Sequence, residues 1–405
     1  MAIEKQIDLE EAITSVNMPT ADNIERLDTG ELEVEVADDA TLEAAEAMGF
    51  FDEEEQLIEE FDANLAEKMP EEDLQFVANE LYDGFTRDKD SRQEYDDIAE
   101  EGVTLLGFKD DQGDEPFPGA CSATHPVLAQ AVVKFQAKTY KELFPTEGPV
   151  RTRIIGLDTM QKQEQANRVR QFMNWQTQIQ MPEYGPELDR LLFYVSLYGT
   201  AFKKTYWDPT QQRACTEFVK SSDFYVNYYA SDLDNAERFT HKYTLSKNQV
   251  KKLQLAGMFR DLDVMETSIE ESAATESENE VVGRAKPGMD EDEVEILEVH
   301  ANIDLPGFED EDGLKLPYIV HMTTDEQVLC IRRNWNEDDI LKKKKMYFTH
   351  YTMIPGLGFY GYGYLHLIGG LTKTATSSLR QLIDAGTFAN LPGGFKAHGL
   401  RVLAP

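Results

Sequence analysis

Cysteine is scarce in this chain, and long apolar runs are missing. The 405 residues include three cysteines, Cys121, Cys215 and Cys330, which lie far apart and form no C-x-x-C pair. Neither a disulfide framework nor a zinc knuckle is therefore expected, and a reducing compartment fits this usage. No apolar run approaches the ~18 residues of a membrane span, and the first residues show no signal region. We expect a soluble protein that is intracellular when it is made and contacts no membrane.

Positive charge is also in short supply, above all near the N-terminus. The formal net charge is −37, with 76 acidic and 39 basic residues. Residues 1–80 hold 26 acidic and three basic residues, which predicts a mobile acidic arm with short helices. Lys134–Lys220, by contrast, holds 13 basic and nine acidic residues. The acidity of the whole chain therefore does not exclude contact with nucleic acid.

Catalytic motifs are missing as well. The seven histidines show no metal spacing such as H-E-x-x-H, and the sequence contains neither a G-x-S-x-G nucleophile elbow nor a G-x-x-x-x-G-K-[ST] phosphate loop. Carboxylates stand mostly in runs that are typical of solvated surface. We therefore predict no enzyme activity, no catalytic residue, no metal and no cofactor. An unrecognised hydrolase that uses clustered carboxylates stays open as the least favoured hypothesis.

Hydrophobic periodicity predicts a mostly helical first half. Apolar residues at helical spacing predict two packed helices in residues 70–105, and Pro126 and Pro145 bracket a third helix, whose other face carries lysines. A polar helix and then a buried helix that ends at Gly199 are predicted next. Strands on either side of Asp208-Pro209 predict a hairpin directly afterwards. The buried helix, the glycine and the hairpin should form one compact α+β unit.

The second half begins with a helix and an acidic segment, and then its period changes. Residues 244–259 predict a helix, and residues 261–298 hold 14 acidic and two basic residues, which is typical of a loop or linker. Alternation of period two predicts four or five strands in residues 293–354, with the middle pair joined over Thr324-Asp325. From Ile368 onward helical spacing returns, and it predicts a helix of about 37 Å.

The stretch PGLGFYGYGY contains a G-x-G-x-x-G pattern formed by Gly356, Gly358 and Gly361. A dinucleotide-binding turn also needs an acidic residue about 20 positions on, at the end of a second strand. Here Asp384 falls inside the predicted long helix, and aromatic residues crowd the turn. We therefore predict that these glycines, with Gly363, let the backbone bend between a strand region and a helix.

Three phrases, taken in order, resemble a known family. They are PVLAQAVVKFQAKTYKELFP, then RLLFYVSLYGTAFKKTYWDP, and finally LPYIVHMTTDEQVLCIRRNW followed by GLGFYGYGYLHLIGGLTKTATSSLRQLID. They are similar to the early helix, the wing hairpin and the clip-to-stem passage of the portal proteins of tailed bacteriophages, especially of short-tailed phages. The resemblance covers about residues 75–400. It implies an α+β fold with a wing, a helical stem and a small β-rich clip.

The resemblance also implies a division of the chain. Its parts are an acidic arm (1–69), a wing-like α+β domain (70–240), the first stem helix and an acidic linker (241–292), a β-rich clip-like module (293–355), the glycine bend and second stem helix (356–389), and the start of a tunnel loop (390–405), where the chain looks truncated.

The function that the resemblance implies is structural. Portal subunits form a dodecameric ring at one capsid vertex of the virion, after synthesis in the host cytoplasm, and double-stranded DNA is packaged and ejected through the ring. Implied partners are the terminase large subunit, head-completion or tail adaptor proteins and capsid proteins. The candidates for the DNA channel are Lys373, Arg380, Lys396, His398 and Arg401. The basic run Lys342, Lys343, Lys344 and Lys345 is a candidate contact with phosphate or with an acidic partner such as the terminase, or else a solvated loop.

An alternative function stays open. The chain would then be a phage scaffold or assembly component that binds proteins without contacting DNA, with the acidic arm as its active part. Two long helices flanking residues 293–354 would favour a portal, and their absence would favour a scaffold.

Overall fold

The computed structural model describes residues 24–26, 32–34, 61–108, 117, 120–157, 159–209, 211–264, 272–284, 293–310 and 313–390. The chain divides into two compact units, Met1–Ala63 and Asn64–Pro405. In the first unit, strand β1 (Ile24–Arg26) pairs antiparallel with β2 (Leu32–Val34), a pair that the sequence did not predict. The rest of the predicted acidic arm, up to residue 60, lies outside the described residues.

The boundary of the predicted arm at residue 69 is wrong, because residues 64–69 belong to the second unit. Leu65 and Ala66, in the 3₁₀ turn η2 (Leu65–Glu67), are fully buried. The Asn64 amide donates to the carbonyl oxygen of Leu329 at 3.1 Å, and its oxygen accepts from the Ile331 amide at 3.0 Å. An acidic composition up to residue 62 hid this short apolar anchor.

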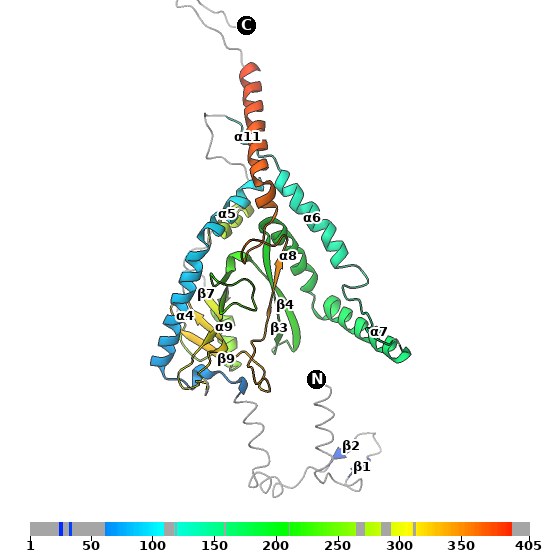
Figure 1. Ribbon diagram of the computed structural model, residues 1–405, viewed down its shortest axis with the longest axis vertical. Helices are drawn as coiled ribbons and strands as arrows, with labels where there is room; N and C mark the ends of the chain where they lie inside the picture. Colours follow the sequence, from blue (N-terminus) through cyan, green and yellow to red (C-terminus); the bar gives the residue numbers. More distant parts are fainter. Residues whose placement is uncertain are drawn as a thin grey trace, which may run out of the picture. The chain divides into compact units, whose positions relative to one another are not determined.

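The second unit is α+β, as expected (Figure 1). Its described residues form eight α-helices: α4 (Glu71–Ser91), α5 (Gln93–Leu105), α6 (Val127–Leu143), α7 (Met160–Trp175), α8 (Tyr184–Tyr198), α9 (Lys247–Leu255), α10 (Ala273–Val282) and α11 (Tyr364–Asn390). A π-helical turn, η3 (Gln176–Gln180), extends α7. No helix among the described residues is long and apolar enough to cross a membrane.

The described residues of this unit also form eight strands in two antiparallel sheets. They are β3 (Thr200–Asp208), β4 (Arg213–Val219), β5 (Phe224–Val226), β6 (Arg238–Ser246), β7 (Glu293–Ile303), β8 (Leu316–Thr323), β9 (Val328–Arg333) and β10 (Phe348–Thr352). The larger sheet has the order β5-β6-β7-β8-β9, and the smaller one has the order β10-β3-β4. Strands β8 and β9 close over Thr324-Asp325, as the sequence predicted.

The smaller sheet packs against helix α8. Leu191 and Val195 of α8 form a buried cluster with Ala201 of β3. Helix α8 ends at Gly199, which has φ = +90°, in the left-handed region that favours glycine. The predicted sequence of buried helix, glycine stop and hairpin is therefore confirmed.

The predicted clip-like module of residues 293–355 is not separate from the rest of the unit. Its strand β7 pairs with β6 over Arg238–Ser246, and its strand β10 pairs with β3 over Thr200–Lys204. The strands on both sides of the acidic segment are thus neighbours in one sheet. Residues 247–292 form a long excursion between two paired strands, which is why composition alone placed a boundary there.

The helix predicted in residues 244–259 is present as α9, but no long helix lies in the described part of residues 241–292. The alternation of β6 continues to Ser246, whose hydroxyl caps α9 in a capping box with Gln249. Helix α9 has nine residues and α10 has ten. Helix α11 packs instead against α5 and α6, where Leu365 joins a buried cluster with Val103, Leu128 and Val132.

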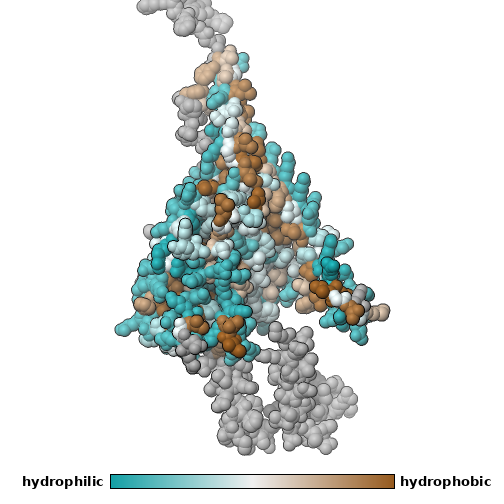
Figure 2. Space-filling view, viewed as in Figure 1, coloured by the Kyte–Doolittle hydropathy of each residue, from teal (hydrophilic) through white to brown (hydrophobic). Residues whose placement is uncertain are grey.

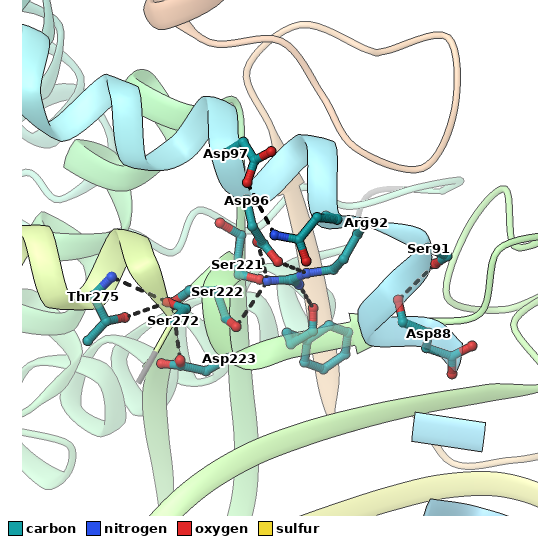
Figure 3. A network of polar contacts seen from close by, with 12 residues as sticks. Asp88, Ser91, Arg92, Asp96, Asp97, Ser221, Ser222, Asp223, Ser272 and Thr275 are labelled. Carbon is teal, nitrogen blue, oxygen red and sulfur yellow. Dashed lines mark hydrogen bonds and ion pairs between the residues drawn. The ribbon is translucent and has the colours of Figure 1, made fainter. Parts of the chain in front are cut away.

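Two arginines, Arg92 and Arg238, fix helices α4 and α5 to the strands, and Figure 3 shows the contacts of Arg92. Arg92, between the two helices, donates from Nη1 to the carbonyl oxygens of Ser221 and Phe224, both at 2.7 Å. It also forms a bidentate ion pair with Asp96 at 2.7 and 3.0 Å. Arg238 of β6 binds Asp88 with two bonds of 2.9 Å. This side of the unit is therefore held by charge-assisted hydrogen bonds as well as by apolar packing.

Candidate functional site: the glycine junction and helix α11

The glycine stretch joins the small sheet to helix α11 through contacts between backbones. The Met353 amide donates to the carbonyl oxygen of Gly199 at 3.0 Å, and the Tyr362 amide donates to that of Ile354 at 2.9 Å. The Gly361 amide donates to the buried Thr200 hydroxyl at 2.7 Å. The start of α11 is thereby fixed to the end of α8 and the beginning of β3.

Three of the four predicted bend glycines are required by this close approach. A Cβ on Gly361 would lie 2.6 Å from the Gly199 oxygen, and one on Gly363 would lie 2.3 Å from the Leu197 oxygen. A Cβ on Gly356 would lie within 2 Å of the Tyr360 oxygen. Real Cβ atoms essentially never come closer than 3.0 Å to other heavy atoms. None of the three has a positive φ, so the need for glycine here is steric.

Gly358 does not share this role, which corrects the prediction that all four glycines form the bend. A Cβ at Gly358 would meet nothing within 4 Å, and the residue has no positive φ. The second glycine of the G-x-G-x-x-G pattern is therefore not required by the backbone geometry. Gly199 was predicted only as the end of a helix, but its backbone also approaches that of Gly363 closely and completes the junction.

One face of α11 lies on its own chain. Leu365, Gly369, Thr372 and Thr376 are buried at spacings of three and four residues. Farther along this face, two polar side chains hold residues 121–124. Their hydrogen bonds run from Arg380 to the carbonyl oxygens of Ser122 and Ala123, both at 3.0 Å, and from the Cys121 amide to Asp384 at 2.8 Å.

The opposite face of α11 carries exposed leucines. Leu367, Leu371 and Leu382 expose 52%, 66% and 72% of their surface. Figure 2 shows apolar residues along this helix. Ile368 joins the buried cluster of α5, α6 and α8, but Leu371 and Leu382 contact no such cluster among the described residues. Three large leucines along one helix face are a surface suited to another protein chain.

Of the five predicted DNA-channel cations, two contact their own chain and three lie outside the described residues. Lys373 forms an ion pair with Glu101 of α5, and Arg380 is engaged with residues 122–124. Lys396, His398 and Arg401 lie outside the described residues. The charged residues of α11 are Lys373, Arg380 and Asp384, and all three contact their own chain. The described helix therefore presents an almost neutral surface.

The run Lys342–Lys345 is partly structural. Lys342 forms an ion pair with Asp310, and Lys344 donates to the carbonyl oxygens of Leu233 and Ala236 at 2.6 and 2.7 Å. Burial lowers the pKa of Lys344. Lys343 is exposed. Two of the four predicted contact lysines thus bind the chain itself.

A buried polar cluster escaped the sequence analysis. Glu298 of β7 binds Lys204 of β3 at 2.5 Å, and its oxygens lie 3.2 Å from His241 Nδ1 and 3.1 Å from His300 Nε2. Burial alone would raise the pKa of Glu298, but Lys204 and the two histidines hold it well below its usual value. The cluster ties the two sheets together. Only the register that places His241 opposite Glu298 could have revealed it.

The described residues contain no group of three or more His, Cys, Asp or Glu side chains that could hold a metal ion. In the Glu298 cluster the buried His300 Nδ1 has no hydrogen-bond partner among the described residues, and in the glycine turn the space beside Gly356 is occupied by the Tyr360 carbonyl oxygen. Comparison with models of protein families and with curated proteins finds no match to this chain.

Proposed function

We propose that this chain is a structural subunit of a phage portal, which forms a ring through which double-stranded DNA passes. The observation that carries the proposal is helix α11. It has 27 residues, about 40 Å at 1.5 Å per residue, and it starts from a rigid backbone junction. Its outer face exposes leucines along its length.

The charge distribution of α11 supports a role in conduction. A strongly basic wall would bind the phosphates of a moving duplex and retard it. On α11 each charged side chain has a partner in its own chain, and the remaining polar residues are mostly neutral serines and threonines. Copies of this helix around an axis would line a passage whose wall binds the phosphates of a moving duplex only weakly. The terminase large subunit, adaptor proteins and capsid are then the expected partners.

A scaffold that binds proteins without DNA remains the second candidate, and one observation favours it. A single long helix, α11, flanks the described strands between residues 293 and 354, whereas the helices before them have nine and ten residues. In the portal proposal, helix α6 takes the place of the second long helix. It is 17 residues long and packs against α11 in the buried cluster.

The experiment is electron microscopy of the purified full chain, together with an assay of nuclease-protected DNA in packaging extracts. Leu371→Asp should prevent rings and packaging, because the side chain is 66% exposed in the isolated chain but would be buried between subunits. A buried unpaired carboxylate costs several kcal/mol. Leu255→Asp, on α9 and 79% exposed, is the matched control and should assemble normally.

The outcomes separate the candidates. Rings with a central hole that support DNA protection support the portal. Assemblies without a hole, in extracts that package DNA equally well without this protein, favour the scaffold. Normal rings from Leu371→Asp would show that α11 is not a subunit contact and would overturn the assignment of this helix.

A further inference from the structure

The second unit has two flanks of opposite charge. One flank is formed by α4 and α5, and the other by α6, α7 and the residues between them; Figure 1 shows them on opposite sides of the two sheets. We name these the acidic flank (residues 71–105) and the basic arm (residues 126–180). The acidic flank contains 12 acidic and three basic residues, and the basic arm contains eight basic and four acidic residues.

The charges of the basic arm face solvent. All eight of its cations are exposed, and none makes an ion pair with a described residue. They are Lys134, Lys138, Lys141, Arg151, Arg153, Lys162, Arg168 and Arg170.

The basic arm also carries apolar side chains that nothing in the described residues covers. Helix α7 has no buried residue. Ile155, Leu157 and Ile179 expose 91%, 83% and 67% of their surface, and Phe172 exposes 59%. Figure 2 shows apolar residues gathered on this arm beside polar ones. An uncovered apolar patch rimmed by charge is the ordinary composition of a protein interface.

The acidic flank has the complementary composition. Its exposed carboxylates recur at helical spacing from α4 into α5, as at Asp83, Asp90, Glu94 and Asp97. Phe76, 62% exposed, stands on the same flank. Because Arg92 and Arg238 anchor these helices, the stripe is held in place rather than formed on binding.

We infer that the basic arm of one subunit docks on the acidic flank of a second copy of this chain. The two surfaces differ and lie on opposite sides of the unit, so the contact is heterologous, and repeating it generates a ring when the rotation closes. Opposite charge steers the two copies into one orientation and disfavours arm-to-arm pairing. The inference rests on the assembly part of the proposed function, and it does not depend on DNA passing through the ring.

The test is a pair of charge-reversal variants of the full chain. The arm variant carries Lys162→Glu, Arg168→Glu and Arg170→Glu. The flank variant carries Glu80→Lys, Asp83→Lys and Glu94→Lys. All six positions are exposed, so both variants should fold, and circular dichroism checks this. The control, Lys252→Glu with Lys315→Glu and Lys343→Glu, makes the same charge change at exposed positions outside both surfaces.

Sedimentation at low salt measures assembly. Each reversed variant alone should assemble about a hundredfold more weakly than the native chain, since like charges at an interface cost several kcal/mol. A mixture of the two should assemble again, because each arm then meets a flank of opposite charge. A single chain with all six changes should also assemble, and the control should behave as the native chain does.

Four outcomes would overturn the inference. They are a native chain that stays monomeric at low salt, an arm variant that assembles alone, a mixture that does not regain assembly, and an arm variant that keeps assembly but loses retention on a DNA column. The last outcome would assign the arm to phosphates. Restored rings that fail to support DNA packaging would leave this interface standing and refute the portal function instead.

Discussion

Gly361→Ala tests the physical basis of the glycine junction. The new Cβ would lie 2.6 Å from the Gly199 oxygen and 2.8 Å from the Ile354 oxygen. Both contacts are with backbone, so no side chain can turn away, and the strand or the helix start must move. Overpacking of this kind costs about 1–3 kcal/mol.

Moving the backbone also strains a buried hydrogen bond. The Gly361 amide donates to Thr200 Oγ1 at 2.7 Å, and an unpaired buried donor costs about 1–3 kcal/mol. We therefore expect Gly361→Ala to lower the free energy of unfolding by about 3 kcal/mol. Gly358→Ala, three residues away, meets no atom within 4 Å and should leave stability unchanged or raise it by about 0.5 kcal/mol, because alanine restricts the unfolded chain.

Urea unfolding followed by circular dichroism measures both variants against the native chain. The midpoint should fall for Gly361→Ala and hold for Gly358→Ala, with similar slopes in urea. Equal losses of stability from the two substitutions would refute the steric argument, because only Gly361 has backbone atoms close to the position of the new Cβ.

Two further predictions concern buried charge. Burial lowers the pKa of His350 to about 4 from 6.5, so the unfolded chain binds the extra proton between these values, and stability should fall as the pH drops from about 6.5 to 4. His350→Phe, which can keep the stack with Phe202 and Phe359, should flatten this slope in urea titrations at several pH values; an unchanged slope would refute it. Arg92→Met should cost about 3–5 kcal/mol because Asp96 and three carbonyl oxygens lose their buried donor. The exposed control Arg87→Met should change stability by less than about 0.5 kcal/mol, and equal effects would contradict the assigned role of Arg92.

Local sequence patterns predicted the helices, strands and turns of this fold better than they predicted which strands pair with one another. The helix ending at Gly199, the hairpin around Asp208-Pro209 and the turn at Thr324-Asp325 follow from residue spacing and turn chemistry, because these depend on neighbours in sequence. The pairing of β6 with β7 across an acidic excursion does not, since the register of distant strands is set by the packed structure. Composition therefore placed domain boundaries inside a continuous sheet.

The candidate site divides in the same way. The sequence predicted that four glycines allow a backbone bend. The structure requires three of them because other backbone atoms come close, whereas Gly358 is required neither for such an approach nor for a positive φ. Lys373 and Arg380 looked like free cations because their partners, Glu101 and residues 122–124, lie more than 250 positions away in sequence. The opposite charges of the acidic flank and the basic arm are visible in the sequence, but their placement on opposite sides of the two sheets could be seen only in the fold.

The pairing of β10 with β3 has a consequence for synthesis. Strand β3 gains β4 at once through the hairpin, but its other edge waits until Phe348–Thr352 has left the ribosome. At 5–20 residues per second, the 144 residues from Asp208 to Thr352 take about 7–29 seconds to synthesise, and this edge stays unpaired for that time. An unpaired strand edge is a template for pairing with another nascent chain. Copies made side by side on one messenger therefore meet while this hairpin is still able to accept the wrong strand.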